Sequence, residues 1–185
     1  MAIGRTFNVV GSHCAGEVCD VVGGVLDVPG SSMFEKRNYV WRNKDHIRNL
    51  LMNEPRGSSA MCCNLILPKC NPEADAGFII MEHEGYPRMS GASKIAISTV
   101  LLEIGMLPMH EPIAPLKLNT PDSLVLLIAH CQAGKVNSIE YENIPTFVYA
   151  LDLNIMLLAL MCLSKSPLPG EGCGMSWWTQ ALWVW

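Results

Sequence analysis

The sequence predicts an α+β fold in which a sheet wraps around one buried helix. Short β-rich and apolar runs are separated by glycine and proline turns, residues 93–104 are apolar nearly all round, and strands are predicted before and after that segment. Strands on both sides of a buried helix are typical of a sheet wrapped around that helix. The chain has 185 residues, half of them hydrophobic and 16% charged, which excludes a disordered protein.

The N-terminal part is predicted to be a strand meander followed by a helix. Residues 6–10 and 18–25 are β-rich and are separated by glycines, as in strands joined by turns. Ser32 and Glu35 have the spacing of a capping box, and apolar residues follow at helical intervals. We therefore expect a helix over about residues 33–52, and a break near Asn43 is the alternative.

The next elements are predicted to surround the buried helix. Two apolar runs of strand length, 60–67 and 77–82, precede it, and Gly105 follows it where a glycine commonly ends a helix. The expected strands after the helix are 116–119, 124–131 and 138–141, the last two joined as a hairpin.

Charge and motif content restrict the partners and cofactors. The net charge is −4 and no run of five basic residues occurs, so we expect a small-molecule partner and neither a nucleic acid nor a membrane surface. The sequence has no P-loop, no G-x-G-x-x-G and no H-E-x-x-H motif. We therefore expect no cofactor and no metal.

Eight cysteines raise the question of disulfides or a metal site. No C-x-x-C pair occurs, although three neighbourhoods could be imagined as sites: His13–Cys14, Cys62–Cys63 and His130–Cys131. Nothing marks secretion, because the first ten residues lack the apolar core of a signal peptide. We expect reduced, buried thiols and a cytoplasmic protein.

The segment 154–185 differs in character from the rest of the chain. It holds four of the five tryptophans within its last nine positions. Its run of nine apolar residues, Ile155 to Leu163, is less than half of the roughly 20 residues that span a bilayer. We expect this segment to pack on a missing partner or not to be native-like at all, and a transmembrane helix is the alternative.

The most informative segment for function lies immediately before the buried helix, at Met89-Ser90-Gly91-Ala92-Ser93. The first backbone N–H groups of a helix have no partner within the helix and lie at the positive end of its dipole. The amides of Gly91 and Ala92 could hold a substrate carboxylate there. The alternative is that Ser90 or Ser93 only caps the helix.

Two other groups of polar residues are weaker candidates. His13 and Glu17 bring an imidazole and a carboxylate close together, which suits acid-base chemistry, although a turn with a satisfied polar pair is the simpler interpretation. Residues 82–84, Glu-His-Glu, follow a predicted strand and could approach Ser90, or could form a solvated loop.

Several separated motifs, in order, resemble the proline racemase family over about residues 5–153. The matching segments are 13–17 (HCAGE), 28–30 (VPG), 53–57 (NEPRG), 72–82 (PEADAGFIIME), 89–95 (MSGASKI) and 99–105 (TVLLEIG). We therefore expect residues 1–153 to form the first lobe of a two-lobed fold. Residues 154–185 would be a divergent apolar tail in place of the second lobe.

The resemblance also implies a reaction and a site. In the family, substrate binds in the cleft between two similar lobes, and racemases use a cysteine from M-C-G-H and a second from S-P-C-G-T. Here Ser90 takes the first position, which looks like the branch of trans-3-hydroxy-L-proline dehydratases, hydro-lyases that form Δ1-pyrroline-2-carboxylate. Ser90 is then catalytic, and Gly91 and Ala92 bind substrate.

The sequence departs from the family pattern in three ways. Ala92 and Lys94 replace polar residues usual in the motif, Cys62-Cys63 is an uncommon pair, and no S-P-C-G-T or S-P-T-G-T motif occurs. The leading hypothesis is therefore an incomplete dehydratase acting on hydroxyproline or proline. The alternatives are a proline racemase or 4-hydroxyproline 2-epimerase, a non-catalytic family member, and a membrane-associated structural protein. A homodimer is left open.

Overall fold

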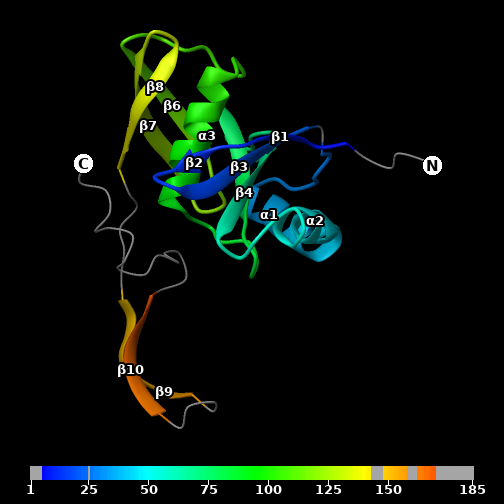
Figure 1. The fold of residues 1–185 in the computed structure, drawn as a ribbon, viewed down its shortest axis with the longest axis vertical. Coiled ribbons are helices and arrows are strands. Elements are labelled where there is room, and N and C mark those ends of the chain that lie inside the picture. Colours follow the sequence, from blue (N-terminus) through cyan, green and yellow to red (C-terminus); the bar gives the residue numbers. More distant parts are fainter. Residues whose placement is uncertain (1–5, 25, 143–147, 158–161, 170–185) are drawn as a thin grey trace, which may run out of the picture. The chain divides into compact units, whose positions relative to one another are not determined.

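The computed structural model describes residues 6–24, 26–142, 148–157 and 162–169, and it divides the chain into two compact units, Met1–Asn143 and Ile144–Trp185 (Figure 1). The elements of the first unit are β1 (Asn8–Val10), β2 (His13–Cys14), β3 (Glu17–Gly23), α1 (Met33–Lys44), α2 (His46–Met52), β4 (Met61–Leu67), β5 (Ala76–Met81), α3 (Gly91–Glu103), β6 (Ile113–Asn119), β7 (Leu124–Gln132) and β8 (Lys135–Tyr141).

One mixed sheet of eight strands organises the first unit. Its order is β1-β3-β4-β5-β6-β7-β8, and β2 pairs with β3. The pairs β3/β4 and β5/β6 are parallel, whereas the other pairs are antiparallel. The helix α3 contacts β2 and β3 near one end of the sheet and β8 at the other, so the sheet curls around it (Figure 1). The predicted α+β fold class is confirmed.

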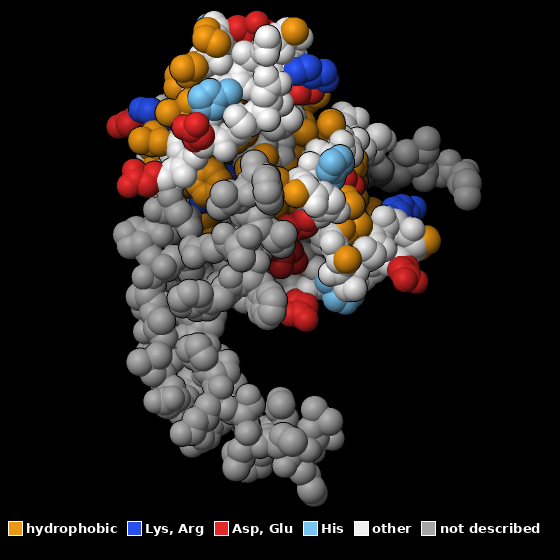
Figure 2. All heavy atoms as spheres, turned by 60° about the vertical axis from the view of Figure 1, so that its left-hand side comes forward, with side chains coloured by type: hydrophobic (Ala, Val, Ile, Leu, Met, Phe, Trp, Pro, Cys, Tyr) orange, Lys and Arg blue, Asp and Glu red, His pale blue; other side chains and the backbone are white. Residues whose placement is uncertain are grey.

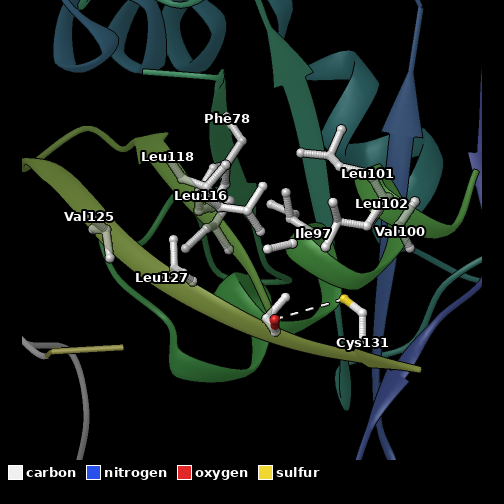
Figure 3. Packing of buried hydrophobic residues seen from close by; sticks show 14 residues of the cluster. Phe78, Ile97, Val100, Leu101, Leu102, Leu116, Leu118, Val125, Leu127 and Cys131 are labelled. Carbon is white, nitrogen blue, oxygen red and sulfur yellow. Dashed lines mark hydrogen bonds between the residues drawn. The ribbon is translucent and has the colours of Figure 1, made fainter. Parts of the chain in front are cut away.

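Strand alternation divides the buried residues between two layers. In β5, Phe78 and Ile80 face α3, whereas Ile79 and Met81 pack with the layer that contains α1 and α2. The layer around α3 also receives apolar side chains from β6 and β7, as Figure 3 shows for Leu116, Leu118, Val125 and Leu127. A helix covered on so many sides must be apolar nearly all round, which explains the composition of residues 93–104.

The predicted helix over residues 33–52 is two helices, so the alternative with a break is the correct one. Ser32 caps α1, and its hydroxyl accepts the backbone N–H of Glu35 at 3.2 Å. The Glu35 carboxylate in turn accepts hydrogen bonds from the N–H and hydroxyl of Ser31, the residue before the cap, at 2.8 Å. The break falls at Asp45, whose carboxylate pairs with Arg48 at 2.8 Å in the first turn of α2.

The outer face of β6 and β7 carries exposed apolar side chains. Ile113 is 51% exposed and Leu126 is 58% exposed, while their neighbours Ala114 and Leu127 are buried against α3. In the space-filling view, hydrophobic side chains are interspersed with charged and polar ones on the visible face of the described residues (Figure 2).

The second unit contains two described strands, β9 (Val148–Leu157) and β10 (Cys162–Pro169), which pair antiparallel. In the part of the chain that the structure describes, no helix is long and apolar enough to cross a membrane. Residues 170–185, which hold the tryptophan cluster, lie outside the described residues. The predicted lobe boundary at residue 153 stays a prediction.

Candidate active site

Ser90 lies at the N-terminus of α3 and caps it. Its backbone is extended, with φ −150° and ψ 132°, and its hydroxyl oxygen accepts the N–H of Ser93 at 3.2 Å. The side chain is half-buried. Capping is therefore real, and it holds the Ser90 oxygen in place. Because the oxygen acts as an acceptor in this bond, the hydroxyl hydrogen can still be donated elsewhere.

The next two residues leave backbone donors at the start of the helix. Gly91 and Ala92 are buried, and among the described residues their N–H groups have no hydrogen-bond partner. Such amides at the positive end of a helix dipole are a ready site for an anion. The geometry therefore allows capping by Ser90 and carboxylate binding by Gly91 and Ala92 at the same time.

Tyr141, the last residue of β8, closes over this helix terminus. A β-carbon built on Gly91 would lie 2.6 Å from the Tyr141 hydroxyl oxygen. Burial raises the pKa of Tyr141, and the nearby Cys14 raises it further, so the phenol is neutral at physiological pH. Sequence reasoning missed this residue, because only the curl of the sheet brings residue 141 to residue 91.

Lys94 adds a positive charge to the first turn of α3. Its side chain is 1% exposed, and its ammonium lies 4.4 Å from the centre of the Tyr141 ring. The aromatic face favours a cation in this position. The sequence comparison singled out Lys94 only as a departure from the family motif.

Three thiols, one each from β2, β3 and β4, pack against the same helix. Cys14, Cys19 and Cys62 form a buried cluster with Ala92 and Ala96 of α3. The pKa of the Cys14 thiol is raised to about 11 by burial, with further contributions from Glu17 and Cys62.

The thiol of Cys62 behaves differently from its neighbour. A hydrogen bond from the Cys19 thiol lowers the pKa of Cys62, and the Ser93 hydroxyl, 3.5 Å from its sulfur, lowers it further against the effect of burial. The same bond, followed by burial, raises the pKa of Cys19. The six cysteines described between residues 6 and 142 are free, and five are buried, as predicted.

The weaker sequence candidates make no described hydrogen bond to Ser90. His13 pairs with Val18 in the sheet and is exposed, and Cys14, not His13, is the register partner of Glu17. No described hydrogen bond joins His13 to Glu17.

Residues 82–84 also make no described contact with Ser90. Glu82 bonds to Gly85 through its backbone, which closes a turn after β5. Burial raises the pKa of its carboxyl, as do Glu17 and Glu84. The charges of Glu17 and Glu82 also act to raise the pKa of the Cys62 thiol, so both carboxyl groups lie near it.

The sequence matches the family model described as proline racemase over residues 9–160. The chain belongs to the proline racemase family. Solved family structures resemble it closely. A hydroxyproline epimerase from Agrobacterium vitis, with bound trans-4-hydroxy-L-proline, is 32% identical with a TM-score of 0.81, and the match covers 90% of this chain and 49% of that one.

A probable proline racemase from Agrobacterium radiobacter K84, with bound carbonate, is 33% identical with a TM-score of 0.82 over 90% of this chain and 50% of that one. The chain thus spans about half the length of these family relatives, consistent with one lobe. A methylitaconate Δ-isomerase is 12% identical with a TM-score of 0.51, and the match covers 69% of this chain and 35% of the isomerase chain. At this identity the likeness shows the fold alone.

Proposed function

We propose that this chain supplies the first half of a trans-3-hydroxy-L-proline dehydratase, a lyase that releases water and forms Δ1-pyrroline-2-carboxylate. The observation that carries the proposal is Ser90, which occupies the N-cap of α3 where the racemases of the family have a cysteine. Ser90 is the proposed catalytic residue, and Gly91 and Ala92 are the proposed substrate-binding residues.

The helix terminus fits the carboxylate of an amino acid. Two buried N–H groups without a described partner, at Gly91 and Ala92, would receive the carboxylate oxygens. Lys94 adds positive charge nearby, and the neutral Tyr141 adds no negative charge that would repel an anion. The small-molecule partner is therefore hydroxyproline, with proline as the simpler analogue.

A serine at position 90 favours elimination over racemisation. Racemisation needs acid-base groups of matched pKa on both faces of Cα, and a serine hydroxyl is a far weaker acid than a thiol of pKa about 8.5. In trans-3-hydroxy-L-proline, the Cα hydrogen and the 3-hydroxyl lie on the same face of the ring. Elimination therefore needs catalytic groups on only one face.

The proposed reaction balances without a cofactor. A base on the same face of the ring as Ser90 removes the Cα proton, and the electron pair forms the Cα–Cβ double bond. The base passes this proton to the 3-hydroxyl, which leaves as water. The Ser90 hydroxyl, whose oxygen is held by the Ser93 N–H, donates a hydrogen bond to the departing hydroxyl. The enamine product then tautomerises to Δ1-pyrroline-2-carboxylate.

A second candidate function is epimerisation of hydroxyproline at Cα. It is favoured by the hydroxyproline epimerase of Agrobacterium vitis, which is 32% identical and has trans-4-hydroxy-L-proline bound. The residue at position 90 separates the two candidates, because an epimerase must return a proton to the opposite face of Cα.

The test joins residues 1–153 to the second half of that epimerase and measures both reactions. We expect pyrroline formation from trans-3-hydroxy-L-proline and no epimerisation of trans-4-hydroxy-L-proline. Ser90→Ala should abolish dehydration, whereas Ser90→Cys should lower dehydration and introduce exchange of the Cα proton. Epimerisation by the unmodified serine form, without dehydration, would replace the proposal with the second candidate.

A further inference from the structure

A group of metal-ligating side chains lies beside α3 and is not used in the proposed reaction. The carboxylate of Glu17 and the thiol sulfurs of Cys19 and Cys62 all lie within 4.8 Å of one another. Two ligand sulfurs bound tetrahedrally at about 2.3 Å from zinc are about 3.8 Å apart, so this separation is close to that of a formed site.

Two strand pairings bring these side chains together. The parallel pairing of β3 with β4 sets Cys19 directly opposite Cys62, and alternation places Glu17 on the same face of β3 as Cys19. The antiparallel pairing of β2 with β3 sets Cys14 opposite Glu17. Cys14 belongs to the same buried cluster and can provide a fourth ligand. The ligands come from three strands, which is why no C-x-x-C spacing marks the site in the sequence.

The sulfur ligands of this group are buried, whereas its carboxylate is exposed to solvent. Cys19 is 0% exposed and Cys62 is 2% exposed, whereas Glu17 is exposed at the β2–β3 turn. An ion can therefore reach the two buried sulfurs from the exposed side of Glu17. Cysteine sulfur and glutamate oxygen are both zinc ligands in proteins.

Polar neighbours already surround the Cys62 sulfur as they surround a ligating thiolate. The Ser93 hydroxyl lies 3.5 Å from it, and the side-chain amide nitrogen of Asn64 donates to it at 4.0 Å. Asn64 is fully buried, and its Oδ1 has no hydrogen-bond partner among the described residues. Such outer contacts orient a ligand and favour its charged form.

We propose that Glu17, Cys19 and Cys62 bind one thiophilic divalent cation of the zinc type, with Cys14 as the fourth ligand. The sequence analysis predicted no metal, and this inference replaces that expectation. A disulfide between Cys19 and Cys62 is the competing fate of the two sulfurs.

Cadmium titration of the reduced 185-residue chain tests the site, because cadmium thiolates absorb in the near ultraviolet. We expect one equivalent to bind, with the absorption of thiolate ligands. Cys62→Ser should weaken binding by more than the roughly 10–100-fold typical of losing an outer contact. Cys63→Ser is the matched control, since Cys63 is the next residue of β4, is equally buried and faces the opposite layer.

Two further variants keep the test decisive. Glu17→Gln changes an exposed side chain, so it should leave the far-ultraviolet circular dichroism unchanged while weakening cadmium binding. Replacing Cys162 and Cys173 with serine should leave binding unchanged. The proposal would be overturned if Cys62→Ser and Cys63→Ser lost cadmium affinity equally, or if Cys62→Ser kept full affinity. It would also be overturned if a Cys19–Cys62 disulfide formed in preference to the metal complex.

Discussion

The hydroxyl of Tyr141 lies against Gly91, so that a β-carbon at Gly91 would stand 2.6 Å from the hydroxyl oxygen. The two residues are the last of β8 and the first of α3. Their contact joins the end of the sheet to the start of the helix that the sheet surrounds. It also requires a residue without a β-carbon at the position where the proposed carboxylate site begins.

Gly91→Ala should destabilise the first unit by overpacking against Tyr141. Overpacking costs about 1–3 kcal/mol, and the better helix propensity of alanine offsets up to about 1 kcal/mol of this. In a Tyr141→Phe background the clashing oxygen is gone, and the next ring atom is 3.8 Å from the new β-carbon. Urea unfolding would be measured for the native chain, the two single variants and the double variant. The cost of Gly91→Ala should appear only when Tyr141 is present. An equal cost in both backgrounds would contradict the contact.

Ser90→Ala should lower the free energy of unfolding by about 1 kcal/mol through loss of the helix cap. Ser98→Ala is the comparison, because Ser98 lies on the same helix, is fully buried and has a hydroxyl with no hydrogen-bond partner among the described residues. Its removal should be neutral or stabilising. If denaturant unfolding ranks Ser98→Ala as the more damaging change, the assigned cap is wrong.

The Glu82 carboxyl should make stability fall as pH rises. Burial, with Glu17 and Glu84, raises its pKa in the folded state above the ordinary value of 4.5. Between 4.5 and the raised value, the folded state binds more protons than the unfolded chain, so this group's contribution to the unfolding free energy decreases with pH. Glu82→Gln should therefore gain stability relative to the native chain as pH increases through this range.

Glu103→Gln provides the control of opposite sign. Hydrogen bonds from Lys135 and the Val136 N–H lower the pKa of Glu103, so its contribution is present above the ordinary carboxyl pKa and is lost as pH falls. The difference between Glu103→Gln and the native chain should shrink at acidic pH. Stability curves of both variants that run parallel to that of the native chain, measured by urea unfolding on both sides of the ordinary carboxyl pKa of 4.5, would contradict these assignments.

The buried helix should be the most sensitive element of the first unit. Ile97 is 0% exposed in the layer around α3, whereas Ile104, just past the end of the helix, is 48% exposed. Ile97→Ala should cost about 2–5 kcal/mol, and Ile104→Ala should cost much less. Similar costs for the two substitutions would mean that α3 is not the centre of the fold.

The sequence predicted the arrangement of elements well, because local patterns determine them. The strands 60–67, 77–82 and 124–131 are each observed within one residue of their predicted ends. The two-residue strand β2 was missed, since no periodicity can show in two residues. The break at Asp45 lies two residues beyond Asn43, where the sequence had suggested it, because helical spacing continues through the break and does not mark its position.

The candidate site was predictable only where it is local. Ser90, Gly91 and Ala92 are adjacent in the sequence, so the cap and the free amides follow from one helix start. Tyr141 and the thiol group of Cys19 and Cys62 depend on sheet curvature and strand register. These long-range relationships carry no spacing signal in the sequence.

The most direct test of the central claim is whether the amides of Gly91 and Ala92 bind the substrate carboxylate. Residues 1–153, labelled with ¹⁵N and joined to the second half of the Agrobacterium vitis epimerase, would be titrated with trans-3-hydroxy-L-proline and, separately, with its carboxamide. We predict that the acid shifts the amide resonances of both residues and that the carboxamide does so far less. Binding of the acid that leaves both resonances unchanged, or equal shifts with the two ligands, would contradict the account.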